Sequence, residues 1–358
     1  TADFYQRTTR DMIGPAESIP SISGIASDDR AKVNNATLRN RGWELSVSWN
    51  DKLKCGFSYG IGFNVFNYKA VVTKYNNPEG IIYNNHTGLA ANKGYYEGMD
   101  IGEIWGYRAD DLFLSNREID DYLRNVNLTA FKSNDLWRRG DLKYIDSNGD
   151  GRVDGGKGTL ADHGDLQIIG NTTPKYSFGI NLNLGYKGFE ISTLLQGVAK
   201  RDFPISGSNY MFGGNNYNFK EHLDYFSTEN PNGYLPRLTG WKDDKDFLVN
   251  TGYNTTRYLL NAAYMRMKNL TVGYTFNKKQ LRHIGISNLK VYVTCDNLFT
   301  VTKLPKQFDP ETLNQVNMSA GGDAQNTAPG LTSPMKQNGN GMVYPMNRNF
   351  VFGLDFTF

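Results

Sequence analysis

Residues 146–154 read DSNGDGRVD, which matches the beginning of an EF-hand-like calcium loop. In such a loop, positions 1, 3 and 5 supply side-chain oxygens, and a glycine at position 6 allows a sharp turn. Position 7 contributes its backbone carbonyl, and position 9 acts directly or through water. In that order, these positions are Asp146, Asn148, Asp150, Gly151, Arg152 and Asp154. The pattern therefore predicts a structural calcium site.

The twelfth position of this loop departs from the pattern. It is Lys157, whose ammonium cannot bind a cation, whereas EF-hand loops carry a bidentate glutamate there. The same segment would also form a solvated turn, because Asp and Asn side chains accept hydrogen bonds from nearby backbone amides. Both interpretations, a calcium loop and a hydrogen-bonded turn, stay open on the sequence.

No set of residues suited to covalent catalysis accompanies this loop. The four histidines have no metal-ligand spacing, and no serine lies in a recognisable nucleophile elbow. The histidines are His86, His163, His222 and His283. Cys55 and Cys295 lie far apart in strand-like runs, so neither a disulfide nor a metal site has support. We predict that the chain is not an enzyme.

Composition favours strands and turns over helices. Aromatic residues make up 13% of the 358 residues, and 38 residues are glycine. The formal net charge is +3 with the basic residues spread out, so no nucleic-acid partner is expected. No apolar run reaches the roughly 18 residues of a transmembrane helix. The sequence opens without a Met or a signal peptide, and we expect it to be part of a longer polypeptide.

The segment KYSFGINLNLGYK at 175–187 alternates between apolar and polar residues. One face has tyrosines at both ends and mainly aliphatic residues between them, as expected of a strand that crosses a bilayer. That face comprises Tyr176, Phe178, Ile180, Leu182, Leu184 and Tyr186. The other face carries Asn181 and Asn183 and would line a wet lumen.

Five further segments show the same period of two. They are residues 43–49, 55–65, 189–199, 270–276 and 289–299. Leu194 interrupts the alternation in the third of these. Met265 and Met267 have the opposite parity to Leu270, which predicts a β-bulge or the end of the membrane zone between them.

The connections between these segments alternate between short and long. Short ones are expected at 50–54, 186–189 and 277–288, and long ones at 11–37, 67–174, 204–257 and 303–345. The strands are expected at 1–10, 38–50, 54–67, 174–187, 188–202, 260–277, 288–301 and 346–358. Outer-membrane barrels have short periplasmic turns and long extracellular loops, which places the long loops outside and the C-terminus in the periplasm.

The predicted fold is all-β, a transmembrane antiparallel β-barrel segment of about eight strands with long extracellular loops. A soluble β-sandwich also alternates, but long strands with polar faces rich in Asn, Ser and Gly suit a barrel with a wet lumen better.

The C-terminal sequence FVFGLDFTF at 350–358 supports this choice. Its apolar face comprises Phe350, Phe352, Leu354, Phe356 and Phe358. A terminal amphipathic strand that ends in an aromatic residue resembles the signal read by the outer-membrane barrel-assembly machinery. In a soluble protein, the same strand would be an aggregation-prone edge.

Several stretches, taken together and in order, resemble the SusC/RagA family of TonB-linked outer-membrane proteins of Bacteroidetes. The central one is GDLKYIDSNGDGRVD, followed by LQIIGNTTPKYSFGINLNLGYKGFEISTLLQG. The others are LRNRGWELSVSW, EGMDIGEIWGYRADDLF, YMRMKNLTVGYTF and ISNLKVYVTCDNLFT. These stretches extend over almost the whole chain.

The resemblance implies a barrel of about 22 strands, of which this chain would supply the C-terminal third. Residues 1–358 would then be part of a single barrel domain, and the family's plug and TonB box are not in this chain. The family imports glycans, oligosaccharides or peptides for nutrient uptake beneath a SusD-like surface lipoprotein. The implied partners are this lipoprotein, the remaining barrel and plug, TonB through that missing part, outer-membrane lipid and the cargo.

The resemblance also supplies a candidate for the acid missing at position 12 of the calcium loop. In the family, a shorter loop runs into an acidic residue just before an IIG sequence. Here GDLQIIG follows after the extra residues GGKGTLAD, which makes Asp165 the candidate and Asp162 the second choice. The expected Ca²⁺ ligands are therefore Asp146, Asn148, Asp150, Arg152, Asp154 and Asp165.

Three other functions stay open on the sequence. A siderophore or cobalamin receptor would keep the barrel and change the cargo, and the family-like stretches argue against it. An outer-membrane barrel enzyme would need catalytic side chains that converge on one loop mouth. An adhesin would need only the large loops.

Overall fold

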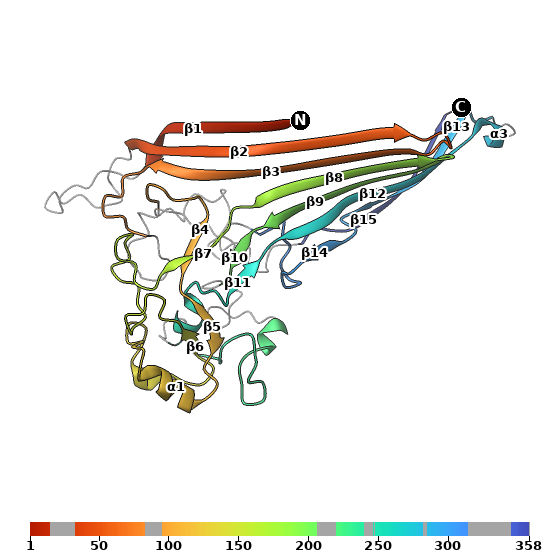
Figure 1. The fold of residues 1–358 in the computed structure, drawn as a ribbon. Coiled ribbons are helices and arrows are strands. Elements are labelled where there is room, and N and C mark those ends of the chain that lie inside the picture. The colour runs from red at the N-terminus through yellow and green to blue at the C-terminus, as the bar shows by residue number, and fades with distance from the viewer. Residues whose placement is uncertain are drawn as a thin grey trace.

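The computed structural model of the chain describes residues 1–14, 33–82, 95–205, 220–239, 246, 248–281, 285–313 and 345–357. Among these residues, no helix is long and apolar enough to cross a membrane. One long antiparallel sheet dominates the structure, and a second unit built from its connections lies at one end of the strands (Figure 1).

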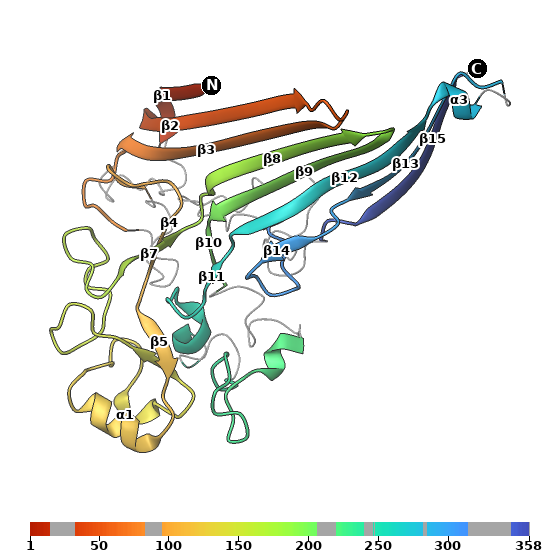
Figure 2. The same cartoon turned by 45° about the vertical axis from the view of Figure 1, so that its right-hand side comes forward.

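The main sheet has nine strands in the described part of the chain. Eight of them are neighbours in the order of the sequence, and β14 (Thr300–Thr302) pairs with β12. The eight are β1 (Ala2–Gly14), β2 (Val33–Lys52), β3 (Ser58–Lys74), β8 (Lys175–Tyr186), β9 (Phe189–Lys200), β12 (Tyr264–Phe276), β13 (Asn288–Asp296) and β15 (Asn349–Thr357). The predicted antiparallel arrangement is confirmed, with β1 and β15 at the two edges of an open sheet (Figure 2).

The register of the main sheet places apolar residues opposite apolar residues. Phe63 of β3 lies opposite Val47 of β2 and Ile180 of β8, and Val293 of β13 lies opposite Phe352 of β15. Because side chains alternate along a strand, these residues share one side, called here the apolar face. It carries Leu45, Val47, Trp49, Ile61, Phe63, Phe178, Ile180, Leu182, Leu184, Ile191, Val272, Val293, Phe350, Phe352, Leu354 and Phe356. The face predicted for residues 175–187 is therefore confirmed, whereas Phe358 lies outside the described residues.

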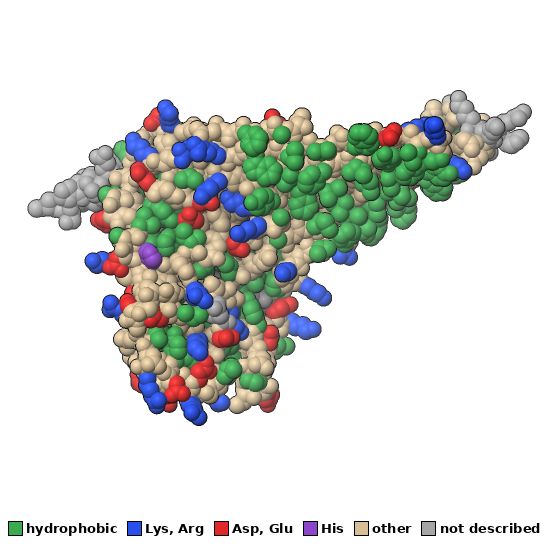
Figure 3. Space-filling model, in the orientation of Figure 1, with side chains coloured by type: hydrophobic (Ala, Val, Ile, Leu, Met, Phe, Trp, Pro, Cys, Tyr) green, Lys and Arg blue, Asp and Glu red, His purple; other side chains and the backbone are tan. Residues whose placement is uncertain are grey.

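The apolar face is exposed. Phe352 is 78% exposed, Leu354 67% and Trp49 63%. Figure 3 shows hydrophobic side chains gathered over the strands, while charged side chains gather over the second unit. A contiguous apolar surface of this kind marks a membrane or protein interface, because it is unfavourable in water. With a rise of about 3.3 Å per residue and a tilt of about 40°, a strand such as residues 176–186 spans about 25 Å, the height of a barrel's apolar band.

Aromatic side chains border the apolar face at both ends. The rings of Trp43 and Tyr176 lie 6.5 Å apart at the end near the second unit. At the opposite end, the rings of Phe189 and Tyr274 lie 4.6 Å apart, and Tyr186, the last residue of β8, lies opposite Phe189. Aromatic residues at two such levels are typical of the interfaces of a membrane-spanning sheet.

Two predicted strand boundaries are wrong for local reasons. Residues 54–57 were expected in a strand but form the turn before β3, where Gly56 has a φ of 87°. The predicted strand 288–301 is broken after Asp296, because Asn297 has a φ of 52° and turns the chain between β13 and β14. At both positions the chain turns through a left-handed backbone conformation, which Gly and Asn adopt more readily than other residues.

The irregularity predicted before Leu270 is a β-bulge in β12. The register between β12 and β9 shifts between Met267 and Asn269, which makes Lys268 the extra residue. Met267 lies opposite Leu195, so the bulge returns it to the apolar face that Leu270 also occupies.

β2 and β3 extend beyond the residues of β3 that pair with β8. β8 pairs with β3 only as far as Phe66. Further along, the Val72 N–H donates to the carbonyl of Met99 at 2.9 Å, and the Ile101 N–H donates to the carbonyl of Ala70 at 2.8 Å. These bonds cover an otherwise open strand edge and attach the second unit to the sheet.

The second unit, called here the loop domain, consists of residues 95–171, 220–239, 246 and 248–258. Its elements are β4 (Glu103–Gly106), β5 (Ala109–Leu112), α1 (Asn116–Leu123), β6 (Leu142–Tyr144), β7 (Gln167–Asn171), short 3-10 helices at Asn134–Leu136 and Lys220–Leu223, and a π-helix at Leu248–Gly252. Its core is aromatic: Phe131 stacks on Tyr144 at 4.4 Å, and Tyr107 meets Phe131 edge-on at 5.2 Å. The same core includes Val72 of β3, so sheet and loop domain are packed together.

Three small elements complete the description. β10 (Asp202–Pro204) follows β9 and pairs with β11 (Leu259–Asn261), and α3 (Lys278–Leu281) lies in the turn between β12 and β13. The predicted strands 188–202 and 260–277 are therefore each divided in two, because the chain leaves the main sheet where it enters the loop domain.

Candidate functional site

The side of the main sheet opposite the apolar face is the candidate functional surface, called here the polar face. Asn183 of β8 lies opposite Gly60 of β3 and Ser192 of β9, and Ser192 Oγ donates to Asn183 Oδ1 at 2.8 Å. The polar face carries Ser46, Ser48, Asn50, Asn64, Asn181, Asn183, Ser192, Gln196, Thr271 and Thr294. Amide and hydroxyl groups of neighbouring strands thus form a continuous hydrogen-bonding surface, as the alternation in residues 175–187 predicted.

Glycines on this polar face leave room for amide side chains of the neighbouring strands. A Cβ at Gly60 would lie 2.3 Å from Asn50 Oδ1, and a Cβ at Gly179 would lie 2.4 Å from Asn64 Oδ1. The amide side chains therefore lie across the glycines of the neighbouring strands. Larger residues at these positions would force the amides away from the sheet.

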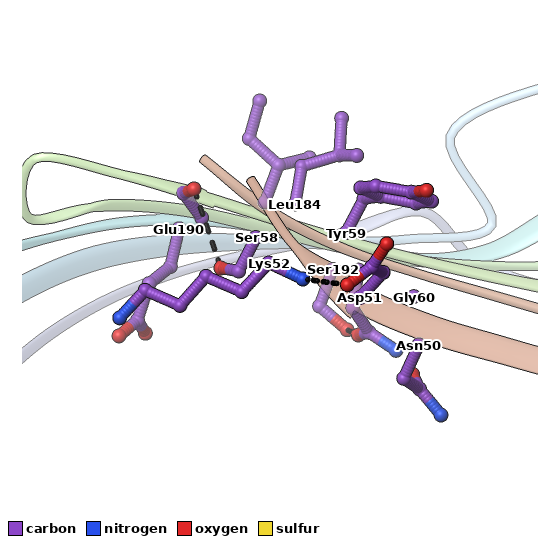
Figure 4. Close-up of a pocket in the computed structure, with 12 residues that line it drawn as sticks. Asn50, Asp51, Lys52, Ser58, Tyr59, Gly60, Leu184, Glu190 and Ser192 are labelled. Carbon is purple, nitrogen blue, oxygen red and sulfur yellow. Dashed lines mark hydrogen bonds between the residues drawn. The ribbon is translucent and has the colours of Figure 1, made fainter. Parts of the chain in front are cut away.

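A shallow groove crosses the polar face near the strand ends that are remote from the loop domain (Figure 4). Its polar and glycine lining consists of Asn50, Asp51, Lys52, Ser58, Gly60, Asn183, Gly185, Glu190 and Ser192. Ser58 Oγ donates to the carbonyl of Gly185 at 3.3 Å. Figure 4 shows Leu184 and Asn50 pointing to opposite sides of the strands, in agreement with their places on the apolar and polar faces.

The groove has the chemistry of a binding surface and not of a catalytic centre. Its lining contains amides, hydroxyls, three charged side chains and the larger residues Tyr59, Leu184 and Ile191, but no His or Cys. Glu190 is paired with Lys290 of β13 at 2.5 Å. Such a surface binds neutral polar groups through hydrogen bonds, whereas nucleophilic catalysis needs a base within reach of the nucleophile.

The loop domain is held by a buried network of four charges. Lys132 Nζ lies 2.7 Å from Asp141 Oδ2 and 2.6 Å from Asp246 Oδ1. Arg237 Nε lies 2.6 Å from Asp141 Oδ1, and its second guanidinium nitrogen contacts Asp246. The network is electrically balanced and joins two segments, 132–141 and 237–246, that are far apart in the sequence. It therefore fixes the shape of the loop domain.

The predicted calcium loop brings Asp165 back onto its first residues. Asp165 is 1% exposed, and its Oδ1 accepts the Ser147 N–H at 2.6 Å while its Oδ2 accepts the Asp154 N–H at 2.9 Å. Burial raises the pKa of Asp165 above its ordinary value although backbone amides of the loop favour the charged form, and the negative charge of Asp146 acts in the same direction as burial.

The remaining predicted ligands are engaged within the loop. Asp146 accepts the Gly151 N–H at 2.8 Å, and Gly151 has a φ of 82°, so the predicted sharp turn is present. Asn148 Oδ1 accepts the Asp150 N–H at 2.9 Å, and Arg152 Nε lies 3.2 Å from Asp150 Oδ2. All the atoms predicted to coordinate the ion are oxygens, which suits Ca²⁺. In this arrangement, however, they form the hydrogen-bonded turn that was the alternative interpretation.

Two further residues of this loop have other roles. Lys157 is directed to Asp162, the second-choice acid, with 3.9 Å between Nζ and Oδ2.

Within the described residues, no group of three or more His, Cys, Asp or Glu side chains is arranged to hold a metal ion. Calcium therefore stays a prediction that this geometry does not require.

The other residues singled out in the sequence are dispersed. His163 lies 5.6 Å from the ring of Trp105, and His222 is buried in the loop domain. His86 and His283 lie outside the described residues. The two cysteines, Cys55 and Cys295, are free thiols.

Sequence reasoning missed a set of buried cations. Lys132, Arg201 and Arg266 are all at most 8% exposed, and each binds several partners. A signal existed for Arg266, because it alternates with Met265 and Met267 in a strand and so had to face the polar side. For Lys132 and Arg201, nothing in the local sequence indicates burial.

Comparisons with known proteins give a consistent result. Over 99% of its length, the chain is 26% identical to the TonB-dependent receptor P3 of Formosa agariphila. Over 88% of its length, it is 21% identical to the TonB-dependent receptor SusC of Bacteroides thetaiotaomicron. The chain spans 32% of the first of these relatives and 28% of the second. No model of a protein family matches it.

Solved structures show the same fold. The chain matches the structure of the RagAB peptide transporter with a TM-score of 0.62 and 21% identity, covering 100% of this chain and 33% of that one. It matches the RagAB peptide importer in the open-open state with a TM-score of 0.61. These matches confirm the resemblance to SusC and RagA and the β-barrel fold class. The relatives are receptors and transporters, not enzymes.

Proposed function

We propose that the chain forms part of the wall and of the extracellular vestibule of a TonB-dependent importer in the bacterial outer membrane. The observation that carries this proposal is the two-faced main sheet, apolar on one side and, from β2 to β13, rich in amides and hydroxyls on the other. The similarity to TonB-dependent receptors supports it. The apolar face would contact lipid, and the polar face would contact the lumen.

The rest of the barrel would come from elsewhere in the same importer. β1 and β15 are the edges of the open sheet. In a membrane, unpaired strand edges are not tolerated, so both edges need partner strands. The proposed partners are the remaining N-terminal barrel, with its plug and its contact to TonB. The chain's share of about a third of its relatives' length supports this arrangement.

The proposed orientation follows from the connections. The loop domain lies at the end of the sheet with the long connections, and α3 and the turn between β8 and β9 lie at the other end (Figure 1). Long connections are extracellular in outer-membrane barrels. The loop domain would therefore face the outside, and the end of β15 would face the periplasm.

The cargo we propose is a neutral glycan or oligosaccharide, with a peptide as the alternative. The polar face presents uncharged groups such as Asn50, Asn181, Asn183 and Ser192 on neighbouring strands. Amides and hydroxyls bind the hydroxyl groups of sugars through both donors and acceptors. Backbone amides of a peptide offer the same hydrogen bonds, and the RagAB structures are those of a peptide transporter.

A surface lipoprotein of the SusD type is the proposed partner of the loop domain. Large apolar side chains are exposed there, among them Leu114 at 51%, Leu223 at 73% and Leu238 at 54%. Exposed apolar residues set among charges are typical of protein interfaces. Docking of the lipoprotein on this surface would close the vestibule from outside.

An uptake assay tests the transport proposal. We would compare labelled neutral oligosaccharides with labelled peptides in cells that carry the full-length importer, in the presence and absence of TonB. Asn183→Trp would fill the polar face, whereas Leu182→Trp, one residue away, would point to lipid. We expect TonB-dependent uptake that only Asn183→Trp reduces severalfold. Uptake that is unchanged when the importer is deleted would contradict the proposal.

Calcium in the loop 146–165 is a separate proposal. Asp146, Asn148, Asp150, Asp154 and Asp165 would hold the ion, together with the carbonyl of Arg152. The return of the buried Asp165 to the start of the loop supports it. The ion would neutralise the acids and stiffen this part of the vestibule.

A further inference from the structure

The terminal strand β15 lies far along the chain from β13, the strand with which it pairs. Residues 303–348 separate it from β14, so a hairpin geometry cannot fix its pairing with β13. Alternation of apolar and polar residues opposes a slip by one residue, because Phe352 and Leu354 would move to the polar face. A slip by two residues keeps every side chain on its face. Something else must therefore distinguish the native register from that slip.

Arg266 of β12 is the centre of a buried cluster on the polar side. Its side chain is 4% exposed. Nε donates to Thr300 Oγ1 of β14 at 2.7 Å, Nη2 lies 2.8 Å from Asp309 Oδ2, and Nη1 lies 2.9 Å from Glu311 Oε2. Lys268, the extra residue of the bulge, also reaches Glu311 at 2.9 Å. The segment after β14 is thus attached to β12 by charged contacts.

Asp309 also contacts the residues just before the terminal strand. Its Oδ1 accepts the Glu311 N–H at 2.9 Å, and its Oδ2 accepts the Met346 N–H at 2.9 Å. Burial alone would raise the pKa of Asp309, but the Arg266 hydrogen bond and the two amides outweigh it and lower the pKa. The carboxylate is therefore charged at neutral pH and holds the chain just before β15 begins.

Asn297 makes a second contact with the same stretch. Its Nδ2 donates to the carbonyl of Asn347 at 2.9 Å. Asn297 occupies the left-handed turn that separates β13 from β14, directly after the residue that pairs with Asn349. Two adjacent residues, Met346 and Asn347, are thus fixed to two different points, Asp309 in the segment after β14 and Asn297 in the turn after β13.

The segment that carries Asp309 is itself firmly seated. The buried guanidinium of Arg201, at the end of β9, donates to the carbonyls of Pro310 at 3.3 Å and Leu313 at 3.1 Å. The rings of Phe308 and Phe203 lie 5.5 Å apart in the shared core. Asp309 is therefore a fixed point, which is what a reference for a strand register requires.

We propose that Arg266, Asp309 and Asn297 form a register clamp that determines which residue of β15 pairs with β13. The clamp holds the chain immediately ahead of β15, so that Asn349 meets Asp296 and Phe352 meets Val293. A two-residue slip would pull Met346 and Asn347 away from both contacts. The proposal depends on the barrel fold and is independent of the cargo.

Disulfide trapping in the full-length protein in its outer membrane tests the clamp. Cys55 and Cys295 are first replaced by Ser. Val293→Cys is then combined with Phe352→Cys, the native pair, or with Phe350→Cys or Leu354→Cys, the pairs of the two possible slips. The clamp is broken by Arg266→Met with Asp309→Asn. The matched control is Arg117→Met with Asp121→Asn, an exposed ion pair of the loop domain.

With the clamp intact, we expect disulfides only in the native pair. In the clamp variant, the ratio of slipped to native disulfides should rise at least tenfold, and the control should not change. If the double variant fails to assemble, Asn297→Gly decides, because it keeps the left-handed turn and removes the contact with Asn347. Exclusive trapping of the native pair in every assembled clamp variant would overturn the proposal.

Discussion

The ammonium of Lys132 lies 2.7 Å from the carboxylate of Asp141, and neither side chain has any exposed surface. Arg237 and Asn250 bind the other oxygen of the same carboxylate, at 2.6 and 2.9 Å. Asp141 thus joins the first long connection of the loop domain to the second. Removal of one charge from such a buried network leaves another buried charge uncompensated, which is strongly destabilising.

We predict that Asp141→Ala destabilises the loop domain by about 3–5 kcal/mol, because it removes one of the two carboxylates that pair with the buried Lys132. The measurement is the urea concentration at which a protease cleaves the loop domain in the membrane-bound protein. Asp121→Ala is the control, since its ion pairs with Arg117 and Arg124 are exposed and each is worth less than about 1 kcal/mol. Equal shifts for the two variants would show that the buried network has no special role.

Calcium should protect the loop 146–165 if the proposed site exists. A ligand at about a hundred times its Kd stabilises the form that binds it by about 2.7 kcal/mol. We therefore expect cleavage within this loop to slow on addition of Ca²⁺ and to recover with a chelator. Asp146→Asn with Asp165→Asn should abolish the difference. The same cleavage rate with and without Ca²⁺, and no bound calcium, would leave only the hydrogen-bonded turn.

Asp165 makes one contribution to the pH dependence of this loop. Its pKa is raised in the folded state, so the folded state favours the protonated acid. The resulting stability is fully present below about pH 4, the ordinary pKa of Asp, and is lost as the pH rises through the folded pKa. Without calcium, hydrogen exchange corrected for intrinsic rates should be slower in acid. Asp165→Asn should remove this part of the pH dependence, and an unchanged profile would exclude Asp165 as its source.

A charge on the apolar face should be far more costly than one on the polar face. Leu182→Arg near the middle of β8 should destabilise the barrel by about 2–4 kcal/mol, whereas Asn183→Arg should cost much less. The two positions are adjacent, so strand propensity and depth in the membrane are matched. Reversible unfolding of the full-length protein in lipid vesicles provides the measurement. A larger loss for Asn183→Arg would reverse the assignment of the faces.

The strands were predictable because their pattern is local. Alternation in residues 175–187 fixes which side chains share a face, and even the bulge before Leu270 was visible as a change of parity. The extensions of β2 and β3 were not predictable, because alternation fades where the strands leave the apolar band. There, pairing is completed by a distant segment, with Val72 bound to Met99.

The loop domain could not be predicted, because its contacts join residues far apart in the sequence. The Leu142 N–H, for example, donates to Asn250 Oδ1 at 2.8 Å. One local signal was overlooked: Ser115 caps α1 by accepting the Glu118 N–H at 3.1 Å, and Ser-x-x-Glu is a capping-box pattern. Spacing predicts five ligands of the calcium loop, from Asp146 to Asp154, and the family resemblance supplies Asp165. Neither predicts the pairing of Asp150 with Arg152.

The central claim is that the two faces of the main sheet meet lipid and lumen, and β8 offers the most direct test. Spin labels are placed singly at Ile180, Asn181, Leu182 and Asn183 of the full-length protein in outer-membrane vesicles. Their accessibility to oxygen, which concentrates in lipid, is compared with that to a water-soluble nickel chelate. We predict oxygen-accessible labels at Ile180 and Leu182 and less oxygen-accessible ones at Asn181 and Asn183. Lipid-accessible labels at Asn181 and Asn183 would contradict the account.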